Sequence, residues 1–171
     1  MSLRRRGRKR RGSETGTLFV IQQQGADGDR YDLRLEIDGV LVSWAISSGP
    51  SINPRDRRMA RRTEDRPVDY ATFEGVDPEG DYAVIVWDRG TYTNGTQREM
   101  RDGLARGHLS FRLQGEKLGG GFTLTRIREG EGETWLLIKR NDEGADYRRV
   151  PVLTRPESVQ SGLTVDDLDD S

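Results

Sequence analysis

Charged residues of alternating sign occupy one face of a short predicted strand, where they are well placed to do chemistry. The segment reads Arg30-Tyr31-Asp32-Leu33-Arg34-Leu35-Glu36-Ile37. Because side chains along a strand alternate between its two faces, the charged residues share one face and the apolar residues form the other. Guanidinium groups donate paired hydrogen bonds to phosphate, so this face could hold a phosphate group. The alternative is a solvated outer face whose ion pairs contribute little.

A second segment, residues 58–66, has the same character. As a regular strand it would carry on one face, in order, Arg58, Ala60, Arg62, Glu64 and Arg66. A basic face interrupted by a carboxylate suits phosphate binding. In the competing interpretation the charges neutralise one another, Arg30 against Asp32 and Arg66 against Glu64 or Asp69, and the network binds nothing.

Composition limits the other chemistry that this chain could do. With 171 residues and no cysteine, it is one domain in size and has neither disulfides nor thiolate metal ligands. The single histidine, His108, begins a predicted strand far from the charged segments and has no candidate metal ligands around it in the sequence. No apolar stretch approaches the ~20 residues that a membrane-spanning helix needs. We therefore expect a protein that is not a membrane protein, with a cytoplasmic, nucleoid-associated location.

Charge is distributed unevenly although the formal net charge is only −1. Residues 4–11 are nearly all Arg or Lys, whereas residues 166–170 are acidic apart from Leu168. Neither end has the periodic apolar residues that would offset the entropy of ordering. We predict a disordered basic arm over residues 1–15, a folded domain over 16–150 and a disordered acidic tail over 151–171. The arm could attract DNA, anionic lipid or an acidic partner, or be a plain solvated tail.

Between the two ends, short runs rich in β-branched and aromatic residues predict strands. These runs are Thr17–Gln24, Arg30–Ile37, Val40–Ser47, Arg58–Asp65, Tyr82–Asp88, His108–Gln114, Phe122–Arg128 and Thr134–Lys139. Turns are predicted at Asp38-Gly39, Gly90, Asn94-Gly95 and Gly119–Gly121. Only Gln97–Arg106 is typical of a helix. The pattern predicts an all-β fold, a small barrel of six to eight strands with one short helix and disordered termini.

The strands belong to a longer series of motifs. In chain order these are Phe19–Gln22, Tyr31–Glu36, Asp38–Leu41, Ser43–Ala45, Gly49–Ser51, Glu64-Asp65, Pro67–Tyr70, Phe73–Val76, Pro78–Gly80, Val84–Thr91, Phe111–Leu113, Gly115–Leu118 and Trp135–Lys139. In order and spacing, the series resembles the 3′-phosphoesterase domain of bacterial DNA ligase D. The resemblance covers roughly residues 17–140, which is nearly the whole predicted barrel.

The resemblance implies a particular metal site. Enzymes of this family resemble a manganese-dependent phosphoesterase built inside a small β-barrel, which removes a terminal ribonucleoside and then the 3′-phosphate from a DNA end. Two histidines and an aspartate hold their metal. By the same resemblance, the histidines fall on Gln24 and Arg30 of this chain, and the aspartate is retained as Asp32.

The resemblance also implies a phosphate grip of arginines, a histidine and a tyrosine. Arg34, Arg58 and Tyr70 retain the family's residues, whereas the histidine has become Arg66 and a lysine before Gly49 has become Ser48. The loop after Pro78-Glu79-Gly80 is also shorter than in the family. The implied pocket contains Arg30, Arg34, Arg58, Arg66 and Tyr70, with Asp32, Glu64 and Glu79 opposite.

These replacements weigh against catalysis. A guanidinium stays protonated and offers only donors, so Arg30 would repel a cation, and Gln24 could supply one neutral oxygen at most. We expect no bound cofactor and a catalytically impaired relative that binds DNA ends or phosphate and assists repair by non-homologous end joining, alone or with proteins such as Ku or a ligase.

Two alternatives stay open. In the first, manganese still binds through Asp32, Gln24 and waters, and the chain is an active DNA 3′-phosphoesterase or 3′-ribonuclease. In the second, the domain is a scaffold whose ends recruit other proteins.

Overall fold

The structure, a computed structural model, describes residues 17–25, 30–76 and 82–169. The predicted basic arm and Glu79 therefore lie outside the described residues. The strands are β2 (Thr17–Gly25), β3 (Arg30–Ile37), β4 (Val40–Ile46), β5 (Arg58–Pro67), β6 (Gly75–Val76), β7 (Ala83–Asn94), β8 (His108–Gly115), β9 (Gly119–Arg128) and β10 (Thr134–Lys139). The helices are η1 (Val68–Thr72), α1 (Met100–Arg106), α2 (Pro151–Thr154) and α3 (Val165–Asp169). Within this described part, no helix is both long and apolar enough to cross a membrane.

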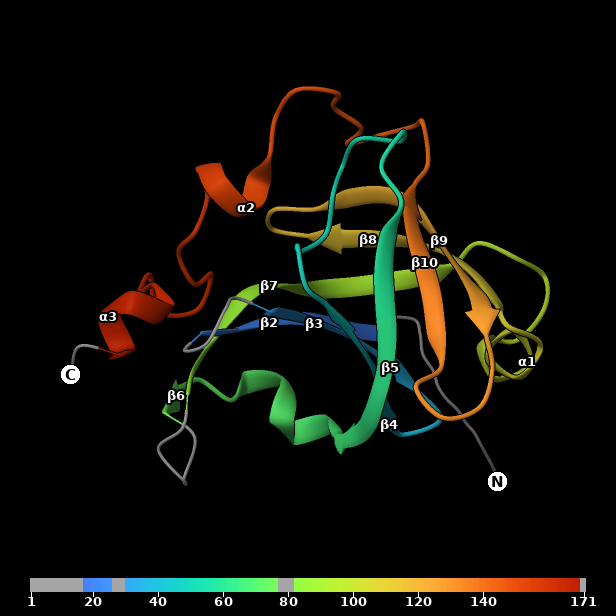
Figure 1. The fold of residues 1–171 in the computed structure, drawn as a ribbon, viewed down its shortest axis with the longest axis horizontal. Coiled ribbons are helices and arrows are strands. Elements are labelled where there is room, and N and C mark those ends of the chain that lie inside the picture. The colour runs from blue at the N-terminus through green and yellow to red at the C-terminus, as the bar shows by residue number, and fades with distance from the viewer. Residues whose placement is uncertain (1–16, 26–29, 77–81, 170–171) are drawn as a thin grey trace.

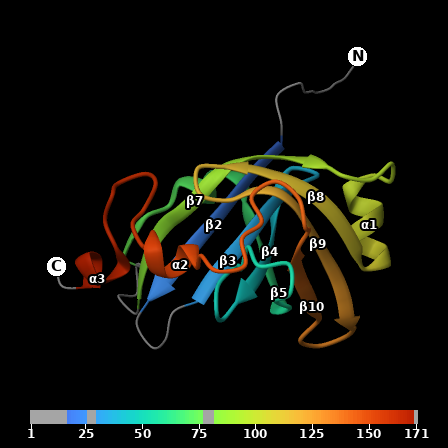
Figure 2. The same ribbon diagram turned by 90° about the horizontal axis from the view of Figure 1, so that it is seen from above.

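Eight antiparallel strands close into a barrel (Figures 1 and 2). Their order around the wall is β2-β3-β4-β5-β10-β9-β8-β7, and pairing of β2 with β7 closes the circle, while the short β6 adds to β7. Inward-facing apolar side chains from every barrel strand fill the interior, and Trp44, Trp87 and Trp135 are fully buried there. The prediction of a small all-β barrel with six to eight strands is confirmed, and the predicted helix is present as α1.

The glycine-based turn predictions are wrong at two places. Gly90 lies inside β7, which extends to Asn94 rather than ending near Asp88. A Cβ atom at Gly90 would collide with the carbonyl oxygen of Gln114, so this glycine lets β7 and β8 approach closely. The residues of Gly119–Gly121 begin β9 instead of forming a turn. Glycine in a strand therefore marks a close contact here, which sequence alone does not distinguish from a turn.

The segment after residue 150 differs from the predicted disordered tail. Helices α2 and α3 lie on one side of the barrel (Figure 2), and Val165 is buried against its core. The indole Nε1 of Trp87 donates to the Arg155 carbonyl at 2.8 Å, and the Ser158 hydroxyl donates to Glu74 Oε1 at 2.6 Å. The tail is thus attached by hydrogen bonds and by a few apolar contacts, which include Val152 and Leu168; their irregular spacing gives the sequence no periodic pattern.

Candidate functional site

The charged face of β3 lies on the outside of the barrel wall. Tyr31 and Leu33 point into the barrel core, so Asp32 and Arg34 point outward. They are nevertheless only 2% and 4% exposed, because Arg30 and Gln24 lie against Asp32 and Tyr70 of η1 lies against Arg34. A second apolar cluster, made of Val20, Leu41, Ala71 and Val86 with Leu18, Tyr70 and Val159 at its edge, seals the contact. The resemblance implied a site inside the barrel; this site lies between the outer wall and a covering helix.

The carboxylate of Asp32 accepts hydrogen bonds on both oxygens. Arg30 Nε donates to Oδ1 at 3.0 Å, while Gln24 Nε2 and Arg34 Nη2 donate to Oδ2 at 3.2 and 3.4 Å. Strand pairing explains this convergence, because Gln24 is opposite Arg30 and Asp32 is next to both on the same face. Two cations and an amide thus surround one buried anion.

Arg34 is the buried cation of the site. Its Nε donates to Gln22 Oε1 at 2.6 Å and its Nη1 to Ser43 Oγ at 2.8 Å. Burial lowers the pKa of Arg34, a change that Asp32 opposes and that the neighbouring Arg66 and Arg30 reinforce. The guanidinium remains charged, because an arginine side chain is not deprotonated in proteins. Arg34 therefore forms the positively charged floor of the site.

Tyr70 and Arg66 form the outer wall of the site. The Cζ atoms of Arg66 and Arg34 lie 4.5 and 5.1 Å from the centroid of the Tyr70 ring. Gln22 Nε2 fixes the covering helix by donating to the Tyr70 carbonyl at 2.8 Å. Within the described residues, no ion pair joins Arg66 to a carboxylate, so its predicted neutralisation by Glu64 or Asp69 is absent there, whereas the pairing of Arg30 with Asp32 is present at 3.0 Å.

These residues do not fit a divalent cation. Asp32 already receives three donors, and the Gln24 amide directs its nitrogen, not its oxygen, toward the carboxylate. Among the described residues no group of three or more His, Asp or Glu side chains is arranged to hold a metal. His108 is on β8, where its Nδ1 lies 3.1 Å from the Thr125 hydroxyl.

Arg58 does not join the other predicted residues. Its Nη2 lies 3.6 Å from Asp56 Oδ2, and its side chain lines a separate cavity beside Tyr147. The prediction that one face of β5 carries Arg58, Ala60, Arg62, Glu64 and Arg66 is only partly right. The first three share a face, but it is the inward one, since Ala60 pairs with Trp135 and is fully buried, and a bulge separates them from Arg66. Thr63 is opposite Ser43 but Arg66 is opposite Leu41, so β5 has one extra residue between them. This bulge turns Arg66 to the outer face.

On β5 it is Arg61, and not Arg58, that lies on the outer face in the same row as Asp32. It pairs with Ala45, and Ala45 pairs with Asp32 on the next strand. A cavity of about 500 Å³ lies at this place and is lined by Arg30, Ala45, Ser47, Met59, Arg61, Thr63, Arg128, Glu131, Gly132 and Thr134. Arg61 and Arg128 were missed by the sequence analysis. Only the cross-strand register, which depends on which strands are neighbours, brings them beside Arg30.

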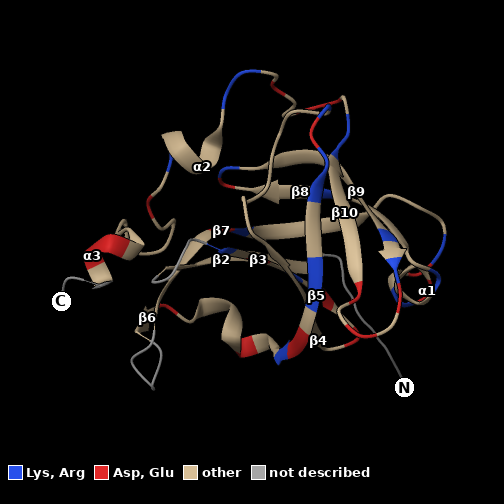
Figure 3. Cartoon of the chain, in the orientation of Figure 1, with Lys and Arg blue, Asp and Glu red and all other residues tan. Residues whose placement is uncertain are grey.

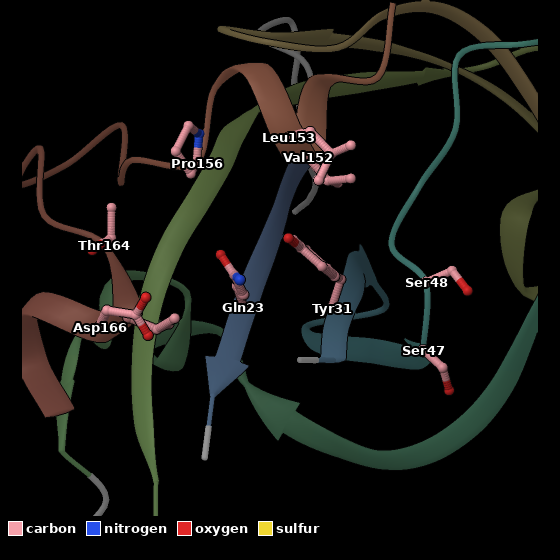
Figure 4. Close-up of a pocket in the computed structure, with 10 residues that line it drawn as sticks. Gln23, Tyr31, Ser47, Ser48, Val152, Leu153, Pro156, Thr164 and Asp166 are labelled. Atoms are coloured by element: carbon pink, nitrogen blue, oxygen red, sulfur yellow. The ribbon is translucent and has the colours of Figure 1, made fainter. Parts of the chain in front are cut away.

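A second cavity, of about 360 Å³, separates the barrel from the tail (Figure 4). The figure shows Gln23 and Tyr31 on the barrel side. Ser47 and Ser48 lie on the loop after β4, and Pro156, Thr164 and Asp166 lie on the tail. Ser48, which stands where the family has a lysine, thus lines this cavity.

Comparison with known proteins yields one matching family. Residues 22–126 match the sequence model of the DNA ligase D 3′-phosphoesterase domain. A multifunctional non-homologous end joining protein LigD from Pseudomonas aeruginosa is 46% identical over 166 residues, which cover 93% of this chain. Relatives from Mycobacterium tuberculosis strain H37Rv and Mycolicibacterium smegmatis are 41% and 36% identical, over 71% and 73% of this chain.

The chain corresponds to a small part of these relatives. The aligned region is 20% of the Pseudomonas protein, 16% of the Mycobacterium tuberculosis protein and 17% of the Mycolicibacterium protein. The similarity therefore concerns one domain of larger, multifunctional proteins.

Proposed function

Since this chain belongs to the family of DNA ligase D 3′-phosphoesterase domains, we propose that it is a catalytically impaired member that binds phosphate-bearing DNA ends. In this role it assists repair by non-homologous end joining, beside end-joining proteins such as Ku or a ligase. The relatives named above carry end joining in their names.

The hydrogen bonds of Asp32 carry the proposal. A carboxylate that serves as a metal ligand needs a free lone pair directed at the ion, but here a guanidinium lies 3.0 Å from one oxygen. Without a metal, the site lacks the Lewis acid and activated oxygen on which this class of phosphoester hydrolysis depends. The same guanidinium groups favour an anion in that place.

The accessible donors are those of Arg30 and Arg66. Arg30 uses Nε for Asp32 and is exposed, so its remaining N–H groups can reach a ligand. Arg66 is half-buried over Tyr70, and Arg34 lies beneath with a charge that Asp32 only partly balances. A phosphate bound between Arg30 and Arg66 would receive charge-assisted, bidentate hydrogen bonds.

The experiment compares binding of duplexes that end in a 3′-phosphate or a 3′-hydroxyl, measured by fluorescence anisotropy from 50 to 200 mM NaCl. We expect the 3′-phosphate to bind about tenfold more tightly, because hydrogen bonds to a charged group contribute about 1.5 kcal/mol or more. Binding should weaken with salt as counterion release requires. Arg66→Ala should abolish the preference and Arg34→Ala should weaken all binding, whereas Arg140→Ala, at the far end of β10, should change neither.

Equal affinity for the two duplexes, or equal binding at low and high salt, would contradict the proposal. The Arg66 variant keeps the test decisive if Arg34→Ala fails to fold, since Arg66 is only half-buried.

Retention of Asp32, Arg34 and Tyr70 keeps an active enzyme as the second candidate. Incubation with a 3′-phosphate primer and manganese separates the two, because phosphate release would exclude the impaired form and its absence would exclude the enzyme. Co-purification with and without residues 151–171 tests the scaffold hypothesis.

A further inference from the structure

A row of paired residues crosses the outer wall of the barrel from Asp32 to Arg128. Asp32 pairs with Ala45 on β4, Ala45 with Arg61 on β5, Arg61 with Thr134 on β10, and Thr134 with Arg128 on β9. Directly paired residues of antiparallel strands point to the same face, so this row forms one continuous strip. Four steps of ~4.8 Å give a length of about 19 Å.

The strip runs along the 500 Å³ cavity described above, and its chemistry is that of an anion site. Three arginines line it against a single carboxylate, Glu131, and the hydroxyls of Ser47, Thr63 and Thr134 add neutral hydrogen-bonding groups. Met59, which is 63% exposed, adds an apolar side chain on the same wall. The lining thus combines fixed positive charge, hydroxyls and one apolar contact.

Of the three arginines of the strip, Arg30 is paired with Asp32, whereas Arg61 and Arg128 have no carboxylate partner within the part of the chain that the structure describes. There, Arg61 and Arg128 are exposed and form no ion pair within 4.0 Å, whereas the neighbouring Arg62 has Asp65 and Glu133 at 3.7 Å each. Basic positions on β5 and β9 can be followed in Figure 3. The cations that face the cavity therefore remain available to a ligand.

We propose that this strip binds the sugar-phosphate backbone of a nucleic-acid strand whose end lies at the Asp32–Arg34–Arg66 site. The proposal rests on the proposed function, because it extends that site. Arg30 links the two parts, since its Nε binds Asp32 while its side chain also lines the cavity. A strip of about 19 Å is long enough to contact several consecutive phosphates of one strand. Contacts to phosphate and sugar carry no sequence information, so binding should be independent of sequence.

The test uses the full chain and the double variant Arg61→Ala/Arg128→Ala, with Arg140→Ala as the control for loss of an exposed arginine. Ligands are inorganic phosphate, a 3′-phosphorylated mononucleotide, and single strands of 3 to 12 nucleotides that end in a 3′-phosphate or a 3′-hydroxyl. We expect wild-type affinity to rise with length over the first several nucleotides and then to level off, once the strand is as long as the strip. The double variant should bind phosphate and mononucleotide as the wild type does, but gain little with length. The slope of log K against log salt for the 12-mer should fall by about 1.4, or 0.7 for each lost contact.

The outcomes separate this inference from the proposed function. Suppose that the wild type prefers a 3′-phosphate but the double variant keeps the same length dependence and salt slope. Then backbone binding by the strip is refuted, while end binding at the Asp32–Arg34–Arg66 site is supported. If the double variant loses the length dependence while no strand shows a 3′-phosphate preference, backbone binding by the strip is supported and end binding at the Asp32–Arg34–Arg66 site is refuted. Absence of nucleic-acid binding by the wild type overturns both. Unchanged circular dichroism spectra and melting temperatures would show that the variants fold.

Discussion

Asp32 acts here as the counterion of a buried arginine. Its carboxylate is almost fully buried with Arg34, and Gln22 and Ser43 accept hydrogen bonds from the Nε and Nη1 atoms of that guanidinium. The resemblance implied a metal ligand at this position, whereas the structure places the carboxylate against a buried guanidinium. The stability of the fold around η1 should depend on this pair.

Replacing Asp32 by Asn should lower the free energy of unfolding by about 3 kcal/mol, because removal of one partner leaves a buried charge without compensation. Urea unfolding measures this. The matched control is Asp65→Asn, whose carboxylate is 47% exposed and lies 3.7 Å from Arg62; a surface pair of this kind contributes less than about 1 kcal/mol. Equal losses in the two variants would show that the Asp32 pair has no special weight.

Restoring imidazoles should restore a metal site. In the double variant Gln24→His/Arg30→His, two neutral nitrogen lone pairs would lie beside Asp32 in place of an amide donor and a cation. Addition of Mn²⁺ at a hundred times Kd should then stabilise the fold by ~2.7 kcal/mol, seen as a rise of several degrees in Tm. The wild type and the triple variant that adds Asp32→Asn should show no rise. A Tm of the wild type that increases with Mn²⁺ would refute this account of the site.

The residues on one strand of the site were predictable from the sequence, whereas those from other strands were not. Alternation places Asp32 and Arg34 on one face without knowledge of the fold. On β5, the bulge before Arg66 breaks the alternation, and Arg61 meets Asp32 only through the register of two further strand pairs. Neither the bulge nor the register of these strand pairs produces a repeating pattern in the sequence.

Among the helices and strands, those of the tail could not be predicted from the sequence pattern either. Strands that alternate apolar and polar residues were predicted nearly to their ends, as in β3 and β10. The segment after residue 150 is attached to the barrel by individual hydrogen bonds and apolar contacts. Lys117 Nζ donates to the Arg155 carbonyl at 2.8 Å and lies 4.3 Å from the Trp87 ring. Such contacts join residues far apart in sequence and leave no local pattern.

Attachment of the tail should make stability depend on pH. Burial lowers the pKa of Lys117 to about 8, although Glu157 and Asp88 oppose the shift, whereas an unfolded lysine titrates near 10.4. Between these values the unfolded chain binds more protons, so the free energy of unfolding should rise with pH from about 8 to 10. At ~1.4 kcal/mol for each pH unit, reduced because the group is only partly titrated at both ends of this range, the rise attributable to Lys117 is about 2 kcal/mol. Lys117→Met should lack it, and parallel curves for wild type and variant in urea unfolding would contradict the assignment.

For the molecule as a whole, the small net charge conceals local concentrations of charge. The formal net charge is −1, yet residues 4–11 contain seven cations and residues 166–170 four carboxylates. The strip on the barrel wall and the basic N-terminal segment would contribute to DNA binding in different ways. In the proposed function, the strip and the Asp32 site, which are built by strand pairing, distinguish a DNA end. The cations of residues 4–11 would attract any DNA, whatever its sequence or end.

Deleting residues 1–12 should therefore weaken binding to all DNA alike. Loss of seven cations should reduce the affinity for 3′-phosphate, 3′-hydroxyl and closed hairpin duplexes by a similar factor and flatten their salt dependence, because this contribution comes from counterion release. The ratio between the 3′-phosphate and 3′-hydroxyl duplexes should stay that of the full chain. Arg66→Ala should have the opposite effect. The affinities for the 3′-phosphate and 3′-hydroxyl duplexes should become equal, while most of the dependence of binding on salt concentration remains. If the deletion abolished the preference for the 3′-phosphate, end recognition would belong to the N-terminal segment and not to the barrel.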